Sequence, residues 1–299
     1  MSERIHKVLA AAGIASRRAV ERLIAEGRIA VNGAPAAIGQ KIGPRDQVTL
    51  DGRPLRLALG LEPPRALIYK KRVGELVTRA DPEGRRTVFR KLPKLASGRW
   101  IAVGRLDLNS SGLLLLTNDG ELARRLAHPS FEIEREYAVR VLGTADEATL
   151  ARLRRGVKLE DGMARFERIE ASDGHEDEER EASTVPANRW YRVVLREGRK
   201  REVRRLFESQ GLTVNRLIRV RYGPIELGRG IKSGGWRELE REELETLYAA
   251  VGLPLPKARR QATPFKRAAR CANSNQGEGS MALRNQALPL KPRLSGPSR

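Results

Sequence analysis

Residues 98–129, GRWIAVGRLDLNSSGLLLLTNDGELARRLAHP, decide how the centre of this chain folds. An apolar segment that ends at Val103 predicts one strand, and the continuous run Leu113–Leu116 predicts a second, buried strand. The polar residues between them predict a loop that carries Asp107. Because strands fix both ends of that loop, its backbone is expected to hold a reactive side chain in a defined position.

Strands and helices alternate irregularly around this stretch, from Ala66 to about Gly252. The predicted strands are Ala66–Lys70, Trp100–Val103, Leu113–Thr117, Arg135–Val141 and Trp190–Leu195. The predicted helices are Glu121–Leu126, with Asn118 as its cap, Glu147–Arg154, Arg201–Ser209 and Arg241–Ala250. This mixture predicts an α+β domain around a large, mostly antiparallel mixed sheet with flanking helices. Residues 172–187 are polar and acidic and are expected to form an exposed insertion loop.

The first 56 residues are typical of a small separate module. Helical spacing of apolar residues ends at Gly13, Ser16 is placed to cap a second helix, and Asn32-Gly33 predicts a turn before a strand near Val48–Leu50. Its basic side chains are expected to face phosphates, and they are Arg4, Lys7, Arg17, Arg18, Arg22 and Arg28.

Charge points to a polyanionic partner. The 299 residues include 58 Lys and Arg against 37 Asp and Glu, a net charge of +21, with the excess densest at the two ends. Basic charge alone also fits ribosomal proteins and proteins of membrane surfaces. The single cysteine, Cys271, excludes an internal disulfide and a zinc ribbon. The longest aliphatic run is far too short to span a bilayer, so the chain is expected to be soluble and cytoplasmic.

Composition divides the chain into three parts. Residues 57–65 predict a linker, and past Leu253 the sequence becomes rich in Pro, Arg, Lys, Ser and Asn, which predicts a disordered basic tail. The expected domains are therefore 1–60, 61–252 and 253–299.

Two stretches resemble known families. RIHKVLAAAGIASRRAVERLIAEGRIAVNG, followed by DQVTLDG, is similar to the S4 RNA-binding domain over nearly all of residues 3–60. GRLDLNSSGLLLLTNDG resembles the signature of pseudouridine synthases of the RsuA family, and the resemblance covers most of residues 66–252. On the residues alone, an Asp in such a loop more often caps a turn. The resemblance implies instead that Asp107 is the essential catalytic residue of a pseudouridine synthase fold.

Two further segments agree with this family. EREYAVRV, residues 134–141, resembles its second motif, which implies that Tyr137 is the active-site aromatic residue. EGRKREVRRLFESQG, residues 197–211, resembles the third motif, which implies that Arg204 pairs with Asp107. Further RNA contacts are expected from Arg105, Arg201, Arg205, Arg216, Arg219 and Arg221.

The implied reaction breaks the bond from C1′ to N1 of a uridine, rotates the uracil and rejoins C1′ to C5. Asp107 could act as a nucleophile or remove a proton from C2′, and the sequence leaves both routes open. No metal or organic cofactor is expected. Within the family, the order of parts implies ribosomal RNA as the partner, with a uridine near the peptidyl-transferase region of 23S rRNA. The enzyme is expected to be a monomer.

Three alternatives stay open at this point. The chain could be a synthase for small-subunit ribosomal RNA, since the motifs are shared among relatives. It could be a non-catalytic ribosomal RNA-binding or ribosome assembly factor, since the charge and the S4-like module suit one. A metal-dependent nuclease using Asp107 and Asp119 is disfavoured, because a two-metal site needs several converging carboxylates or histidines.

Overall fold

The computed structural model describes residues 2–55, 57, 63–172 and 188–256. Most of the predicted linker, of the acidic segment 172–187 and of the tail 253–299 therefore lies outside the described residues. None of the helices in the described part is long and apolar enough to cross a bilayer.

The N-terminal module follows its sequence pattern closely. Its elements are β1 (Glu3–Arg4), α1 (Ile5–Ala11), α2 (Arg17–Ala25), β2 (Ile29–Val31), β3 (Ala34–Pro35), β4 (Lys41–Ile42), β5 (Val48–Leu50) and β6 (Arg53–Pro54). The Ser16 hydroxyl accepts a hydrogen bond from the Ala19 amide at 3.1 Å, as the predicted cap requires. Asn32 and Gly33 both have positive φ, 53° and 85°, which suits the right-handed twist of the β2–β3 hairpin.

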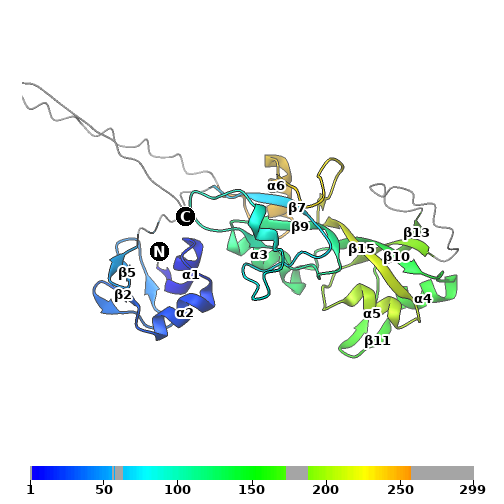
Figure 1. Cartoon of the computed structure of the whole chain (residues 1–299), viewed down its shortest axis with the longest axis horizontal. Helices are drawn as coiled ribbons and strands as arrows, with labels where there is room; N and C mark the ends of the chain where they lie inside the picture. Colours follow the sequence, from blue (N-terminus) through cyan, green and yellow to red (C-terminus); the bar gives the residue numbers. More distant parts are fainter. Residues whose placement is uncertain (1, 56, 58–62, 173–187, 257–299) are drawn as a thin grey trace, which may run out of the picture. The chain divides into compact units, whose positions relative to one another are not determined.

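One large sheet organises the rest of the described chain (Figure 1). Its strands are β7 (Ala66–Lys71), β8 (Ile101–Ala102), β9 (Ser111–Thr117), β10 (Arg135–Leu142), β13 (Arg168–Ser172), β14 (Asn188–Leu195), β15 (Thr213–Tyr222), β16 (Ile225–Glu226) and β17 (Trp236–Glu238). The main order is β13-β14-β10-β15-β9-β7-β17, with β16 on β15 and β8 on β9. Among the described pairs only β9 with β15 is parallel, which confirms the predicted mostly antiparallel sheet.

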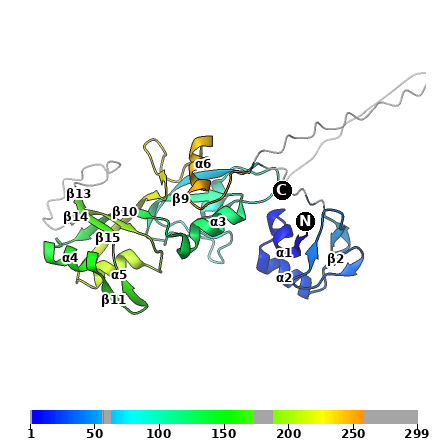
Figure 2. The same ribbon diagram turned by 180° about the vertical axis from the view of Figure 1, so that it is seen from behind.

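Helices pack on both faces of the sheet, and β9 contributes to the core on each face. Leu113 and Leu115 pack with α3 (Gly120–Ala127) and α6 (Arg241–Ala249), whereas Leu114 and Leu116 share a core with α4 (Glu147–Arg155) and α5 (Glu202–Glu208). Successive strand residues point to opposite faces, so a strand buried on both sides must be apolar throughout. In both views α4 and α5 lie with the hairpin of β11 (Val157–Leu159) and β12 (Gly162–Ala164), on one side of β10 and β15 (Figures 1 and 2).

The predicted cap of α3 was wrong by one residue. Asp119, not Asn118, is the N-cap, and its carboxylate accepts hydrogen bonds from the amides of Glu121 (2.8 Å) and Leu122 (3.2 Å). The Asn118 side chain instead accepts from the Arg65 amide and donates to the Pro63 carbonyl, both at 2.8 Å. The Asn118 side chain therefore holds the segment that leads into β7, and the Asp119 carboxylate caps the N-terminus of α3.

Gly112 is required where β9 meets β15. Its φ is +98°, and a Cβ there would lie 2.3 Å from the Arg219 carbonyl oxygen and 2.7 Å from its nitrogen. Backbone atoms of a paired strand cannot move aside, so the absence of a side chain at Gly112 allows the parallel pairing that follows the Asp107 loop.

We predict that Gly112→Ala lowers the free energy of unfolding by roughly 2–4 kcal/mol, through steric conflict added to backbone strain. Gly211→Ala is the matched control, because Gly211 also has a positive φ (+73°) but open space around its Cβ position. Urea unfolding of both variants measures the difference. Equal losses at the two positions would contradict the proposed close approach.

Candidate active site

The loop between β8 and β9 presents the Asp107 side chain to solvent while its backbone is fixed. Val103 is fully buried and Leu106 is 8% exposed, so both anchor the loop to the cores below it. The Ser110 amide donates to the Asp107 carbonyl at 3.1 Å and closes a tight turn. The carboxylate of Asp107 is exposed and accepts no hydrogen bond from the described residues.

Lys71, at the end of β7, holds this loop from beneath. Its ammonium group is fully buried and donates to the carbonyl oxygens of Asp107 (2.9 Å), Ser110 (2.8 Å) and Arg72 (2.9 Å). Burial lowers the pKa of Lys71 to about 8, although the charges of Glu75 and Asp107 oppose the shift. Within the described part of the chain, the Lys71 ammonium group therefore binds backbone carbonyls and no carboxylate.

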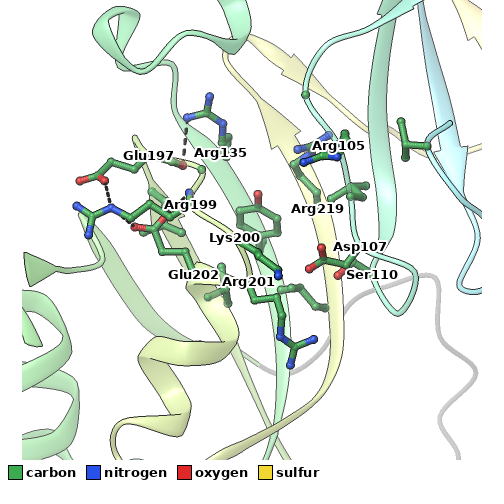
Figure 3. A pocket seen from close by; sticks show the side chains of 18 of the residues that line it. Arg105, Asp107, Ser110, Arg135, Glu197, Arg199, Lys200, Arg201, Glu202 and Arg219 are labelled. Carbon is green, nitrogen blue, oxygen red and sulfur yellow. Dashed lines mark hydrogen bonds and ion pairs between the residues drawn. The ribbon is translucent and has the colours of Figure 1, made fainter. Parts of the chain in front are cut away.

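A pocket of about 740 Å³ opens above the loop. Its charged lining consists of Arg105, Asp107, Arg135, Glu197, Arg199, Lys200, Arg201, Glu202 and Arg219, most of them drawn in Figure 3. Basic side chains outnumber acidic ones in this lining, so the pocket is suited to a polyanionic substrate. Its volume lies within the range of small-molecule sites, about 300–1,000 Å³.

Tyr137, which the motif resemblance implied as the active-site aromatic residue, lies in the wall of this pocket. It occupies β10 between Val193 of β14 and Arg219 of β15, and only 8% of it is exposed. Lys200, just before α5, extends toward Asp107 in Figure 3. The pocket therefore brings a carboxylate, an aromatic ring and a cation together from three separate segments.

The segment before α5 forms the wall opposite Asp107. Glu197 pairs with Arg199 at 2.6 Å, and the Glu202 carboxylate accepts a hydrogen bond from the Arg199 amide at 3.0 Å (Figure 3). Burial raises the pKa of Glu202, which is 3% exposed. Arg201 is in the left-handed region with φ 52°, a conformation that costs energy outside glycine and is often found at functional sites.

Arg204 does not contact the Asp107 carboxylate in this structure. Its Nη1 donates to the Val214 carbonyl at 2.6 Å and its Nη2 to the Asn109 carbonyl at 3.0 Å. Burial is the main cause that lowers the pKa of Arg204, and the charge of Asp107 acts in the opposite direction. Arg204 is close enough to be affected by that charge, yet it holds the backbone of the loop.

Many of the predicted RNA-binding side chains already have partners within the protein. The pairs include Lys7 with Glu3, Arg28 with Asp51, Arg201 with Glu208, Arg205 with Asp161, Arg221 with Glu134 and Glu136, and Arg219 with the Leu113 carbonyl. Exposed side chains of the set are Arg4, Lys7, Arg17, Arg18, Arg22, Arg28, Arg105, Arg201 and Arg216. Of the whole set, only Arg105, Arg201 and Arg219 line the pocket.

Sequence reasoning missed Lys71, Lys200 and Arg135. Arg135 is 6% exposed and its Nη1 donates to the carbonyls of Arg196 (2.6 Å) and Glu197 (3.1 Å), which fixes the start of the opposite wall. A charged residue at the end of an apolar strand, as in ALIYKK, was the available signal for Lys71. Nothing in the local sequence distinguished the other two from surface cations.

The fold and the site define a class of enzyme. Residues 65–209 match the RNA pseudouridylate synthase family and residues 3–48 match the S4 domain. A crystal structure of pseudouridylate synthase shares the fold, with a TM-score of 0.55 and 22% identity over 82% of this chain and 99% of that one. The chain belongs to the pseudouridine synthase family, whose members are enzymes that isomerise uridine to pseudouridine.

Within that family, individual relatives are close in sequence. The chain is 54% identical over 255 residues to ribosomal large subunit pseudouridine synthase B of Haemophilus influenzae, covering 84% of this chain and 69% of the relative. It is 52% identical over 257 residues to the protein of the same name from Salmonella typhimurium, covering 85% of each.

Lys71 has a pKa of about 8 in the folded protein and an ordinary value of 10.5. We predict that its titration raises the free energy of unfolding as the pH rises through this window. In that window the unfolded chain binds more protons than the folded one, so the free energy of unfolding increases with pH. Lys71→Met should lose this increase. Urea unfolding of both proteins at several pH values measures it, and equal slopes would show that Lys71 is not the group responsible.

Proposed function

We propose that this enzyme isomerises one uridine of large-subunit ribosomal RNA, with Asp107 as its catalytic carboxylate. The observation that carries the proposal is the exposed carboxylate on a fixed loop, facing a basic pocket with Tyr137 in its wall. The names of the relatives support the large-subunit target, since proteins half identical over most of the chain are large-subunit synthases.

Entry of the uridine is the first demand on the site. A stacked base must be rotated out of its helix or loop, at a cost of a few kcal/mol. Arg105, Lys200 and Arg201 at the pocket are suited to hold phosphates on either side of the target and to offset that cost. The Tyr137 ring is proposed to stack on the extruded uracil, worth about 1–3 kcal/mol.

Cleavage of the glycosidic bond is the second demand. The carboxylate of Asp107 either attacks the nucleotide or removes the C2′ proton, and both routes require its ionised form. As the nucleotide excludes water, the cations Lys71, Lys200 and Arg204 favour the negative charge. Lys71 and Arg204 also hold carbonyl groups of the loop, so the backbone that carries the carboxylate has little freedom to lose.

The rest of the proposal concerns the setting of the reaction. The relatives are named as synthases of the ribosomal large subunit, which supports a cytoplasmic setting. We also propose that the enzyme acts as a monomer and without a metal ion. The nuclease alternative loses support, because Asp119 caps α3 and accepts a hydrogen bond from the Tyr248 hydroxyl at 2.7 Å.

We predict that Asp107→Asn abolishes release of tritium from ribosomal RNA labelled at uracil C5, because an amide cannot serve either route. The melting temperature should not change, since the carboxylate accepts no hydrogen bond within the described residues. Wild-type release should be insensitive to EDTA. Release by the variant at the wild-type rate would show that Asp107 is not the catalytic carboxylate. Release from labelled small-subunit RNA but not from large-subunit RNA would refute the proposed target.

We predict that Arg18→Gln weakens RNA binding and reduces the slope of log K against log salt by about 1, as expected for one lost phosphate contact. Arg28→Gln is the matched control, because Arg28 already donates to Asp51 at 2.8 and 2.7 Å. Filter binding across salt concentrations compares them. An equal change of slope in both would refute the S4-like helix face as the contact.

A further inference from the structure

The hydroxyl of Ser110 is buried without a partner beside the active-site carboxylate. Ser110 is 1% exposed, and its Oγ has no hydrogen-bond partner among the described residues. Buried polar side-chain atoms are satisfied in the large majority of native structures, and an unsatisfied one costs about 1–3 kcal/mol. Ser110 also lines the pocket that holds Asp107, so its missing partner is to be sought there.

The backbone around Ser110 cannot shift to satisfy it. The Ser110 amide is bonded to the Asp107 carbonyl at 3.1 Å, and Lys71 binds the carbonyls of both residues, at 2.8 and 2.9 Å. Arg204 holds the Asn109 carbonyl between them at 3.0 Å. With the turn fixed at three carbonyls, only a side-chain rotation can bring a partner to the hydroxyl.

The Asp107 carboxylate is the group free to make that rotation. It is exposed, and no hydrogen bond or ion pair holds it in the described part of the chain. Positions 107 and 110 are the first and last residues of the turn, so their Cα atoms are within about 7 Å of each other. Figure 3 shows the two side chains next to each other at the edge of the pocket.

A direct contact between Ser110 Oγ and the substrate is less favourable. The hydroxyl oxygen has almost no surface open to the pocket, so a nucleotide would have to displace the loop to reach it. The Asp107 carboxylate lies on the same turn, three residues away, so it is the nearer candidate partner.

We propose that Ser110 is a positioning residue for the reaction: when the uridine enters, the Asp107 carboxylate rotates to accept a hydrogen bond from the Ser110 hydroxyl. This inference rests on the proposed role of Asp107. The hydrogen bond stabilises the ionised carboxylate as water leaves, and it fixes the direction in which the reactive oxygen points. In the free enzyme the Asp107 carboxylate is exposed to solvent, and the Ser110 hydroxyl has no partner among the described residues.

Ser110→Ala tests the proposal, because it removes a hydroxyl that makes no hydrogen bond to the residues the structure describes. We expect an unchanged or slightly raised melting temperature, since deletion of an unsatisfied buried hydroxyl costs little. The single-turnover rate at saturating RNA should fall about 10- to 100-fold, as for a lost hydrogen bond to a charged group, with RNA affinity unchanged. Ser111→Ala is the control, because Ser111 does not line the pocket.

Each other result overturns the inference. A fall in melting temperature that accounts for the lost rate would make Ser110 structural. A weakened RNA affinity with an unchanged saturated rate would make it a substrate contact. Equal rates for Ser110→Ala, Ser111→Ala and wild type would leave the hydroxyl without a role in the reaction. The single-turnover rates of the two variants are compared on the RNA that the wild-type enzyme modifies. If the wild-type enzyme does not modify large-subunit RNA, the proposed target is wrong, and this result is independent of the comparison between the variants.

Discussion

The buried ammonium group of Lys71 is the interaction on which the site depends. A charge removed from water needs compensation, and here backbone carbonyls of the Asp107 loop and of the strand end supply it. The loop is consequently held from below at both ends of its turn. Its exposed face carries the Asp107 carboxylate, which makes no hydrogen bond or ion pair with the described residues and so is available to a substrate.

The remainder of the fold keeps this loop in place and sets the pocket around it. Strand β9 follows the loop and is buried on both of its faces. Its parallel pairing with β15 brings Arg219 beside Gly112. Tyr137 of β10 and the segment before α5 then form the facing walls. The loop before β9, the strands β10 and β15 and the segment that follows β14 meet there because β14, β10, β15 and β9 are consecutive in one sheet.

Arginine serves two purposes in this protein. Arg204, Arg219 and Arg135 are buried and donate to backbone carbonyls around the pocket, so they act as rigid supports for loops and strand ends. Others, such as Arg18 and Arg105, are exposed and suited to phosphates. A planar guanidinium with five donors suits both purposes. Total charge alone would therefore overstate the surface available to RNA.

The sequence by itself determined the class of fold, the approximate bounds of the elements it predicted, and the placement of Asp107 on a loop and of Tyr137 on a strand, because apolar periodicity and a long motif are local properties. Tertiary structure alone decided which cation meets which group. Arg204 was assigned to the carboxylate and was found on the Val214 and Asn109 carbonyls, whereas Lys71 was overlooked. Partners of a long, flexible cation depend on residues brought near by sheet order, and spacing along the chain carries no record of those distances.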